Sequence, residues 1–297
     1  MSAQPAVVHL RAGAARASIA AAGAELTGWR AGGRDLIWQP DPAYWNASSP
    51  VLFPIVGWAR DGKIRVGGHS YPMGVHGFAA ESQFDVEQSA PNKARFILTD
   101  AAASHAIYPF KFRLVLDYTL SETALRIDIL VSNEGDAVMP YACGLHPGFR
   151  WPFASGEQGD YAIVFAEPED PDVPVIAPGG LFGKERRRTS LDGRRLTLSS
   201  SLFMQEAMCF LDARSRSLRF EGLDGMAIRI AAEGFPHFAL WSRPRAPFLC
   251  VETWSGHGDP QGFDGDLYDK PSMIHLQPQQ ERRHCATFEL VGPSISG

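Results

Sequence analysis

The sequence has few of the residue patterns that hold metals, disulfides or nucleotides. Its four cysteines are too widely spread to form a C-x-x-C pair, and no two of its nine histidines lie two or four residues apart. A preformed zinc site is therefore not expected, and the acidic run from Asp264 to Asp269 lacks the ligand count of a calcium loop. No glycine-rich phosphate loop is present. We expect four free, buried thiols in a reducing compartment, with no metal and no cofactor.

Long apolar runs and broad basic regions are also missing. No stretch approaches the ~18 apolar residues of a membrane span, and Arg16 interrupts the alanine-rich stretch 12–24, which therefore does not read as a signal peptide. The net charge is -5, and basic residues are scattered apart from the cluster 184–188. We expect that cluster to lie on a solvated hairpin. These features predict a cytoplasmic protein with neither nucleic acid nor a membrane as partner.

Short strand-like segments dominate the rest of the chain. Hydrophobic residues make up 45% of it, and 29 glycines and 22 prolines are spaced along its length, which divides it into short segments without marking a linker. Helical periodicity is nearly absent; one short turn is expected in 42–48. We predict one all-β domain over residues 1–297, a large antiparallel sandwich with very little helix. The expected strands lie in 84–86, 95–99, 112–120, 125–132, 161–165, 226–231, 248–252 and 286–291, with 112–120 and 125–132 forming a hairpin.

Three polar residues, His76, His146 and Glu252, lie in apolar or glycine-flanked strand ends. An ionisable group is costly in such a place unless it is paired or used, so each is a candidate for acid–base chemistry. Taken singly, a histidine beside apolar neighbours is more often a hydrogen-bonded core residue, and a strand-terminal glutamate is usually a paired edge charge. Only the three together favour a reactive site.

At these residues the sequence resembles the aldose 1-epimerase (galactose mutarotase) family, and more closely its branch of bacterial mutarotase-like proteins. The resemblance spans almost the whole chain, and its specificity comes from the order and spacing of many short motifs. The matching segments are 23–26, 36–38, 49–57, 61–63, 76–79, 146–149, Glu252 with Trp254, 263–266 and 276–278.

The resemblance implies a supersandwich fold of the galactose mutarotase type and an isomerase that interconverts the α and β anomers of a sugar without a cofactor. Glu252 resembles the general base and His146 the general acid, while His76 resembles the helper histidine near the ring oxygen. A base takes the C1 hydroxyl proton while an acid protonates the ring oxygen, and the opened aldehyde recloses on its other face. Flat aromatic rings pack on sugar C–H faces, so Phe149 and Trp254 are candidate sugar contacts.

The sequence departs from the family pattern in the region that recognises the substrate. Trp58 stands where the family usually carries a substrate-contacting arginine, and Arg60 shares a face with it in an extended chain. Both are therefore candidate binding residues. The acidic residue that binds sugar hydroxyls has no clear counterpart, since Glu206 and Asp212 both fall in a weakly matching region. A galactose-specific pocket is therefore not assumed, and glucose, another free aldose, a deoxy or sulfonated sugar and a hexose phosphate all stay open as substrates.

Two other functions compete with an epimerase. A non-catalytic carbohydrate-binding protein would tolerate loss of the acid or the base, so the presence of all three candidate residues argues against it. A hydrolase or lyase on a related sandwich is the second alternative, but glycoside hydrolysis usually needs two carboxylates across the bond. The oligomeric state is left open between a monomer and a homodimer.

Overall fold

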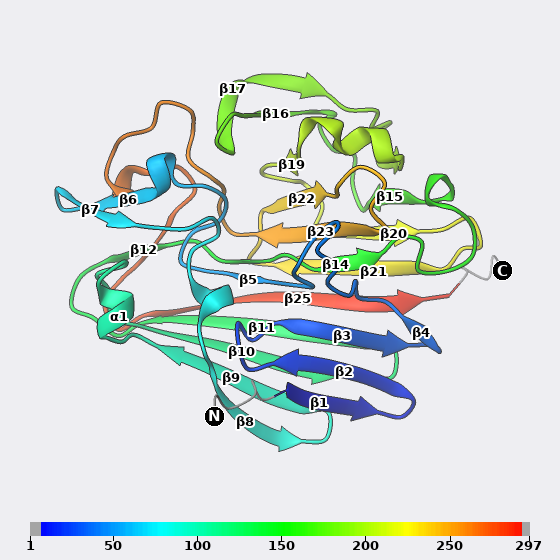
Figure 1. Cartoon of the computed structure of the whole chain (residues 1–297), viewed down its shortest axis with the longest axis horizontal. Helices are drawn as coiled ribbons and strands as arrows, with labels where there is room; N and C mark the ends of the chain where they lie inside the picture. The colour runs from blue at the N-terminus through cyan, green and yellow to red at the C-terminus, as the bar shows by residue number, and fades with distance from the viewer. Residues whose placement is uncertain (1–6, 293–297) are drawn as a thin grey trace.

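The computed structural model describes residues 7–292. It is built almost wholly of antiparallel strands, which confirms the predicted all-β fold (Figure 1). The prediction of one domain over 1–297 stays a prediction, but one cluster of buried apolar side chains runs through the described chain from Val8 to Leu290.

A nine-stranded sheet forms one layer of the sandwich. The predicted hairpin lies at its centre, where Leu120 pairs with Leu125 and the register continues to Phe112 opposite Asn133. Alternate residues of both arms are fully buried and the intervening ones are mostly half-buried, so one face of the hairpin meets the core. In spatial order the sheet contains β18 (Arg195–Thr197), β15 (Ala162–Phe165), β20 (Ser217–Glu221), β21 (Ala227–Glu233), β25 (Glu281–Val291), β11 (Ala124–Asn133), β10 (Phe112–Leu120), β9 (Lys93–Thr99) and β8 (Asp85–Ala90).

Two smaller sheets cover this layer. The first contains β1 (Val7–Ala12), β2 (Ala15–Ala20), β3 (Leu26–Ala31) and β4 (Arg34–Asp35). The second contains β19 (Met208–Phe210), β22 (His237–Trp241), β23 (Phe248–Trp254), β13 (Gly144–Leu145) and β5 (Val51–Leu52), with β14 (Gly148–Arg150) also paired to β23. Phe288 of β25 contacts both sheets, since its ring centroid lies 6.5 Å from that of Trp29 and 5.4 Å from that of Phe149.

Strand β23 is buried on both faces. Leu249 and Val251 join the main core below the sheet, whereas Cys250 and Trp254 belong to clusters on the opposite face. Because alternate residues of a strand point to opposite sides, Glu252 also projects away from the main core. The sheet therefore carries an acidic side chain on a second, outward-facing surface.

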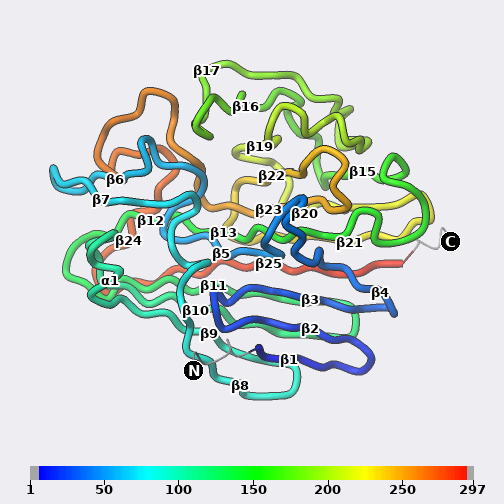
Figure 2. The backbone as a smooth tube through the Cα atoms, in the orientation of Figure 1, coloured from blue at the N-terminus to red at the C-terminus, as the bar shows by residue number. Residues whose placement is uncertain are grey.

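The remaining elements are short. A basic hairpin confirms the prediction for 184–188, since residues 184–186 and 188 are exposed on β17; β17 is drawn above β16 at the top of Figure 2. Residues 42–48 contain a turn and no helix. All four cysteines are free and buried, as predicted. None of the helices in 7–292 has the length and apolar character needed to cross a membrane.

The short elements are the strand pairs β6 (Lys63–Val66) with β7 (His69–Pro72), β12 (Met139–Tyr141) with β24 (Ile274–Leu276) and β16 (Asp172–Ala177) with β17 (Leu181–Arg188), the helix α1 (Ala102–His105), and the 3-10 helices η1 (Arg60–Gly62), η2 (Ala79–Glu81), η3 (Gln158–Asp160), η4 (Ser200–Gln205) and η5 (Leu267–Asp269).

Candidate active site

A pocket of about 460 Å³ opens on the outward face of the six-stranded sheet. This volume lies within the range of small-molecule sites. Its base consists of buried side chains and its rim of exposed ones. The base includes His146, Cys209, Glu252, Trp254 and Phe182, and the rim includes Trp58, Val75, Glu206 and Arg243; the half-buried Trp45, His76 and Trp241 lie between them.

Glu252 lies at the base of the pocket with 1% of its surface exposed. The Trp254 indole Nε1 donates to its Oε2 at 2.9 Å, and His146 Nε2 lies 3.3 Å from the same oxygen. Among residues 7–292, Trp254 is the side chain that donates a hydrogen bond to this carboxylate. Burial raises the pKa of the Glu252 carboxyl well above its ordinary value, while the Trp254 hydrogen bond acts in the opposite direction.

His146 lies on the short connection between β13 and β14, enclosed by aromatic rings. Its ring centroid lies 5.1 Å from that of Trp45, with the planes tilted by 31°, and 5.8 Å from that of Trp241, edge to face. The close packing needs Gly148, because a side chain there would come within 2.8 Å of the Trp45 ring. Burial lowers the pKa of His146 well below its ordinary range, and nearby His76 adds to the effect.

His76 faces His146 edge-on, with ring centroids 5.4 Å apart. Its Nδ1 accepts a 3.0 Å hydrogen bond from the Gly57 N–H, so the proton of the neutral ring resides on Nε2. Burial lowers the pKa of His76 to about 4, which keeps the ring neutral near pH 7. The backbone of His76 has a φ of 64°, and that of Gly77 has 82°. A side chain at Gly77 would collide with the Phe53 carbonyl, as expected from its place in a glycine-flanked motif.

The three residues selected from sequence therefore meet in one pocket, although they come from distant parts of the chain. Glu252 and His146 form a buried carboxyl–imidazole pair whose nearest polar atoms lie 3.3 Å apart, and burial favours the uncharged form of each partner. Within residues 7–292, no group of three or more His, Cys, Asp or Glu side chains is placed to hold a metal ion. The arrangement is suited to proton transfer to and from a small ligand.

Two of the four predicted binding residues line the pocket and two do not. Trp58 lies at the rim with 46% of its surface exposed, and Trp254 lies at the base. Phe149 is fully buried in the main core against Phe288, because its position on β14 directs it to the face opposite the pocket. Phe149 is thus corrected from a sugar contact to a core residue.

Arg60 also lies outside the pocket lining. It begins a 3-10 turn, and its guanidinium donates to the Phe263 carbonyl at 3.3 Å and lies 3.5 Å from the Asp61 carboxylate. The predicted extended chain from Trp58 to Arg60 is wrong because the segment turns at Arg60, which directs the guanidinium elsewhere. The prediction that Arg60 replaces the family arginine in the pocket is therefore corrected.

Sequence reasoning missed several residues that line the pocket, of which three lie close to His146 or to Trp241. Trp45 and Trp241 flank His146, and Arg243 lies just beyond Trp241. Trp45 comes from the expected turn in 42–48, a segment that shows no strand alternation. Trp241 follows the apolar run 238–240, so alternation along that strand was the available signal for it.

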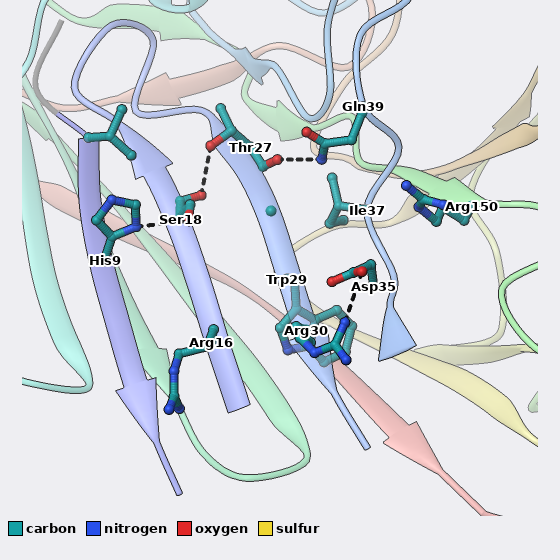
Figure 3. A pocket seen from close by; sticks show the side chains of 12 residues that line it. His9, Arg16, Ser18, Thr27, Trp29, Arg30, Asp35, Ile37, Gln39 and Arg150 are labelled. Atoms are coloured by element: carbon teal, nitrogen blue, oxygen red, sulfur yellow. Dashed lines mark hydrogen bonds and ion pairs between the residues drawn. The ribbon is translucent and has the colours of Figure 1, made fainter. Parts of the chain in front are cut away.

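A larger hollow of about 530 Å³ lies on the outer face of the sheet β1–β4 (Figure 3). Its polar groups are mostly paired with one another, as in the 2.9 Å contact between Arg30 and Asp35 and the 3.0 Å contact between His9 and Ser18. It contains no buried acid–base pair. Its size alone does not make it a candidate for catalysis.

Comparison with known proteins agrees with the chemistry of this pocket. The family model for aldose 1-epimerase matches residues 6–167. The protein LacX of Lactococcus lactis subsp. lactis is 32% identical over 257 residues, covering 83% of this chain and 86% of its own. A galactose mutarotase-like protein from Lactobacillus casei superposes with a TM-score of 0.90 at 26% identity, covering 96% of this chain and 100% of its own. A galactose mutarotase related enzyme from Lactobacillus acidophilus gives a TM-score of 0.87 at 26% identity, covering 98% and 99%. The chain belongs to the aldose 1-epimerase family, and it is an isomerase of the mutarotase type.

Proposed function

We propose that the protein interconverts the α and β anomers of a free aldose by acid–base ring opening and reclosure, with Glu252 as base, His146 as acid and His76 beside the ring oxygen. The observation that carries this proposal is the buried pair formed by Glu252 Oε2 and His146 Nε2 at 3.3 Å at the base of the pocket. A carboxylate and an imidazole in contact can move a proton in both directions, as a reversible anomerisation requires.

In the proposed reaction the single proton of the pair, which the pKa shifts place on Glu252, first passes to His146. Ionised Glu252 then takes the proton of the C1 hydroxyl while protonated His146 gives its proton to the ring oxygen. The bond between C1 and the ring oxygen breaks, and the electron pair of the C1 oxygen forms the aldehyde carbonyl. Rotation about C1–C2 then exposes the other carbonyl face. Reclosure reverses both transfers, so the pair ends each turnover with the single proton with which it began and no cofactor is consumed.

The tautomer of neutral His76 supports its place beside the ring oxygen. Because Nδ1 accepts from Gly57, Nε2–H is the donor that the ring can offer to an oxygen of the sugar. The aromatic rings of Trp45 and Trp241 exclude water around His146, which strengthens electrostatic interactions in the pocket. Each positioned acid or base typically contributes about 10²–10⁴-fold to a rate.

The direct test is the rate at which freshly dissolved α-glucose and α-galactose reach anomeric equilibrium, followed by polarimetry or ¹H NMR with and without protein. Heat-inactivated protein is the control. A rate that increases in proportion to the concentration of native protein, with an unchanged equilibrium ratio, is the expected result. Failure to accelerate either sugar or its 6-phosphate would count against catalysis and favour a non-catalytic sugar-binding protein.

A further inference from the structure

Two charged side chains, Glu206 and Arg243, lie exposed at the rim of the pocket. Strands β19 and β22 are antiparallel, with Met208 opposite Leu240. Continuing this register by two residues brings Glu206 level with Ser242, next to Arg243. An acidic and a basic side chain thus line the same pocket as the buried pair of Glu252 and His146, without forming an ion pair with each other.

The Arg243 guanidinium is free to bind a ligand. Its Cζ lies 5.7 Å from the centroid of the Trp241 ring, a position that limits its motion and orients its donors. No carboxylate of residues 7–292 lies within 4.0 Å of its nitrogens. A guanidinium held on an aromatic face presents a fork of N–H donors that matches a phosphate or two neighbouring hydroxyls.

Glu206 occupies a backbone conformation that normally requires glycine, with φ 65° and ψ -171°. The Nη2 of Arg187, a half-buried residue of β17, donates to the carbonyls of Glu206 at 3.2 Å and Ala207 at 3.3 Å. No carboxylate of residues 7–292 forms an ion pair with Arg187, so these carbonyls are its main partners. Strain of this kind persists where the surrounding structure enforces it, and it concentrates at ligand sites.

We propose that Glu206 and Arg243 are specificity-determining residues that set the preference of the pocket between free and phosphorylated sugars, by opposite charge effects. This inference rests on the proposed function, because it concerns the end of the sugar that lies away from the reacting C1. The Glu206 carboxylate accepts from hydroxyls and repels a phosphate, whereas the Arg243 guanidinium donates to either group and attracts a phosphate.

The test compares kcat/KM for a hexose 6-phosphate with kcat/KM for the parent hexose, and follows the ratio in three variants. Glu206→Gln removes the negative charge with little change of shape and raises the ratio about three- to tenfold, the size expected for one charge acting on a dianion near a protein surface. Arg243→Gln lowers the ratio by a similar factor. Arg243→Lys keeps the charge and holds the ratio closer to the wild-type value.

Two exposed residues outside the pocket lining serve as matched controls. Glu185 lies on the same hairpin strand as Arg187, and Arg245 follows Arg243 by two residues. Their changes to Gln alter the net charge equally but leave the ratio within about twofold, because their charges are screened from the pocket. Ratios that move in opposite directions for Glu206→Gln and Arg243→Gln support the proposal. Ratios that stay unchanged, move in the same direction or move equally in the controls overturn it.

Failure of the proposed function can be distinguished from failure of this inference about Glu206 and Arg243. If wild-type protein accelerates no sugar, the anomerase assignment falls, and the charge effect is then measured as the ratio of dissociation constants for the same two sugars by titration calorimetry. Opposite shifts of that ratio in the two variants would still support the role of the rim. Equal or absent shifts would overturn it.

Discussion

The indole Nε1 of Trp254 donates a 2.9 Å hydrogen bond to Oε2 of Glu252, two residues earlier on the same strand. Residues at i and i+2 of a strand point to the same side, so β23 itself brings the two side chains together. The sequence placed Trp254 in the site as an aromatic surface for the sugar. Its polar atom instead faces the carboxylate, where it restrains Oε2.

Trp254→Phe keeps an aromatic ring in the pocket but removes this donor. A hydrogen bond to a charged group contributes about 1.5–3 kcal/mol, so we expect kcat to fall by about 10- to 100-fold if ionised Glu252 is the reacting form. KM should change less, because the ring that lines the pocket is retained. Steady-state polarimetry measures both constants, and the thermal unfolding midpoint checks that the variant is folded. A variant with wild-type kcat would show that the hydrogen bond does not support the reaction.

The pH dependence follows from the opposite shifts of the buried pair. The pKa of His146 is lowered from 6.5 and that of Glu252 is raised from 4.5. The pair therefore takes up its second proton only below pH 6.5 and still holds its first proton above pH 4.5. We expect log kcat/KM to stay flat as the pH falls through 6.5. An acid limb centred at or above 6.5 would show a histidine with its ordinary pKa.

Phe149 provides a test of the corrected binding surface. Its side chain is fully buried and packs edge to face on Phe288. Truncating a buried Phe to Ala costs about 3–5 kcal/mol of folding stability, and Phe149→Leu, which leaves a smaller cavity, should cost about 1–3 kcal/mol. Chemical denaturation measures this loss, and KM for the sugar should stay within about twofold of the wild-type value. A large rise in KM with unchanged stability would show that Phe149 contacts the sugar.

Much of the fold could be predicted because strand alternation is a local signal. The hairpin 112–120 with 125–132 has the expected pairing, since its apolar residues alternate on both arms. The short strands β5, β13 and β14 carried no such signal. They have two or three residues each and are defined by pairing with β23 and its neighbours, which are distant in sequence.

The residues of the candidate site likewise fall into those that a local sequence pattern could select and those that it could not. Glu252, His146 and His76 could be selected because each is an ionisable group in an apolar or glycine-flanked segment. Arg60 was misplaced because one 3-10 turn redirected it, and a single turn leaves little trace in a pattern of alternation. Arg243 was missed because it lies in an ordinary polar connection. Its proposed role in specificity depends on its contact with the Trp241 ring and on the neighbouring end of β19.

A buried ion pair supports the wall of the pocket. Lys270 Nζ lies 2.9 Å from Asp259 Oδ1, and both side chains are almost fully buried. Asp259 also accepts the backbone N–H of Arg60 at 2.8 Å and donates its own N–H to the Trp58 carbonyl at 2.9 Å. Lys270→Met leaves the Asp259 charge unpaired, so we expect a loss of about 3–5 kcal/mol in the free energy of unfolding.

Chemical denaturation measures this loss, and an exposed pair provides the matched control. The Arg30 and Asp35 side chains also lie 2.9 Å apart, but they are 47% and 60% exposed. Arg30→Met should therefore cost no more than about 1 kcal/mol. Adding Asp259→Asn to Lys270→Met removes the unpaired charge and should recover part of the stability. Equal losses for the buried and the exposed pair would contradict the role given to Lys270.

Glu252→Gln tests the central claim most directly. It keeps the shape of the side chain and removes the carboxylate that can take the C1 proton, so the protein-dependent rate of anomerisation should fall by about 10²–10⁴-fold. Sugar binding, measured by titration calorimetry, should persist. The decisive measurement is polarimetry of fresh α-sugar with equal concentrations of wild-type and Glu252→Gln protein. Loss of acceleration with retained binding is the predicted result, and near-normal turnover by the variant would contradict the assignment of Glu252 as the base.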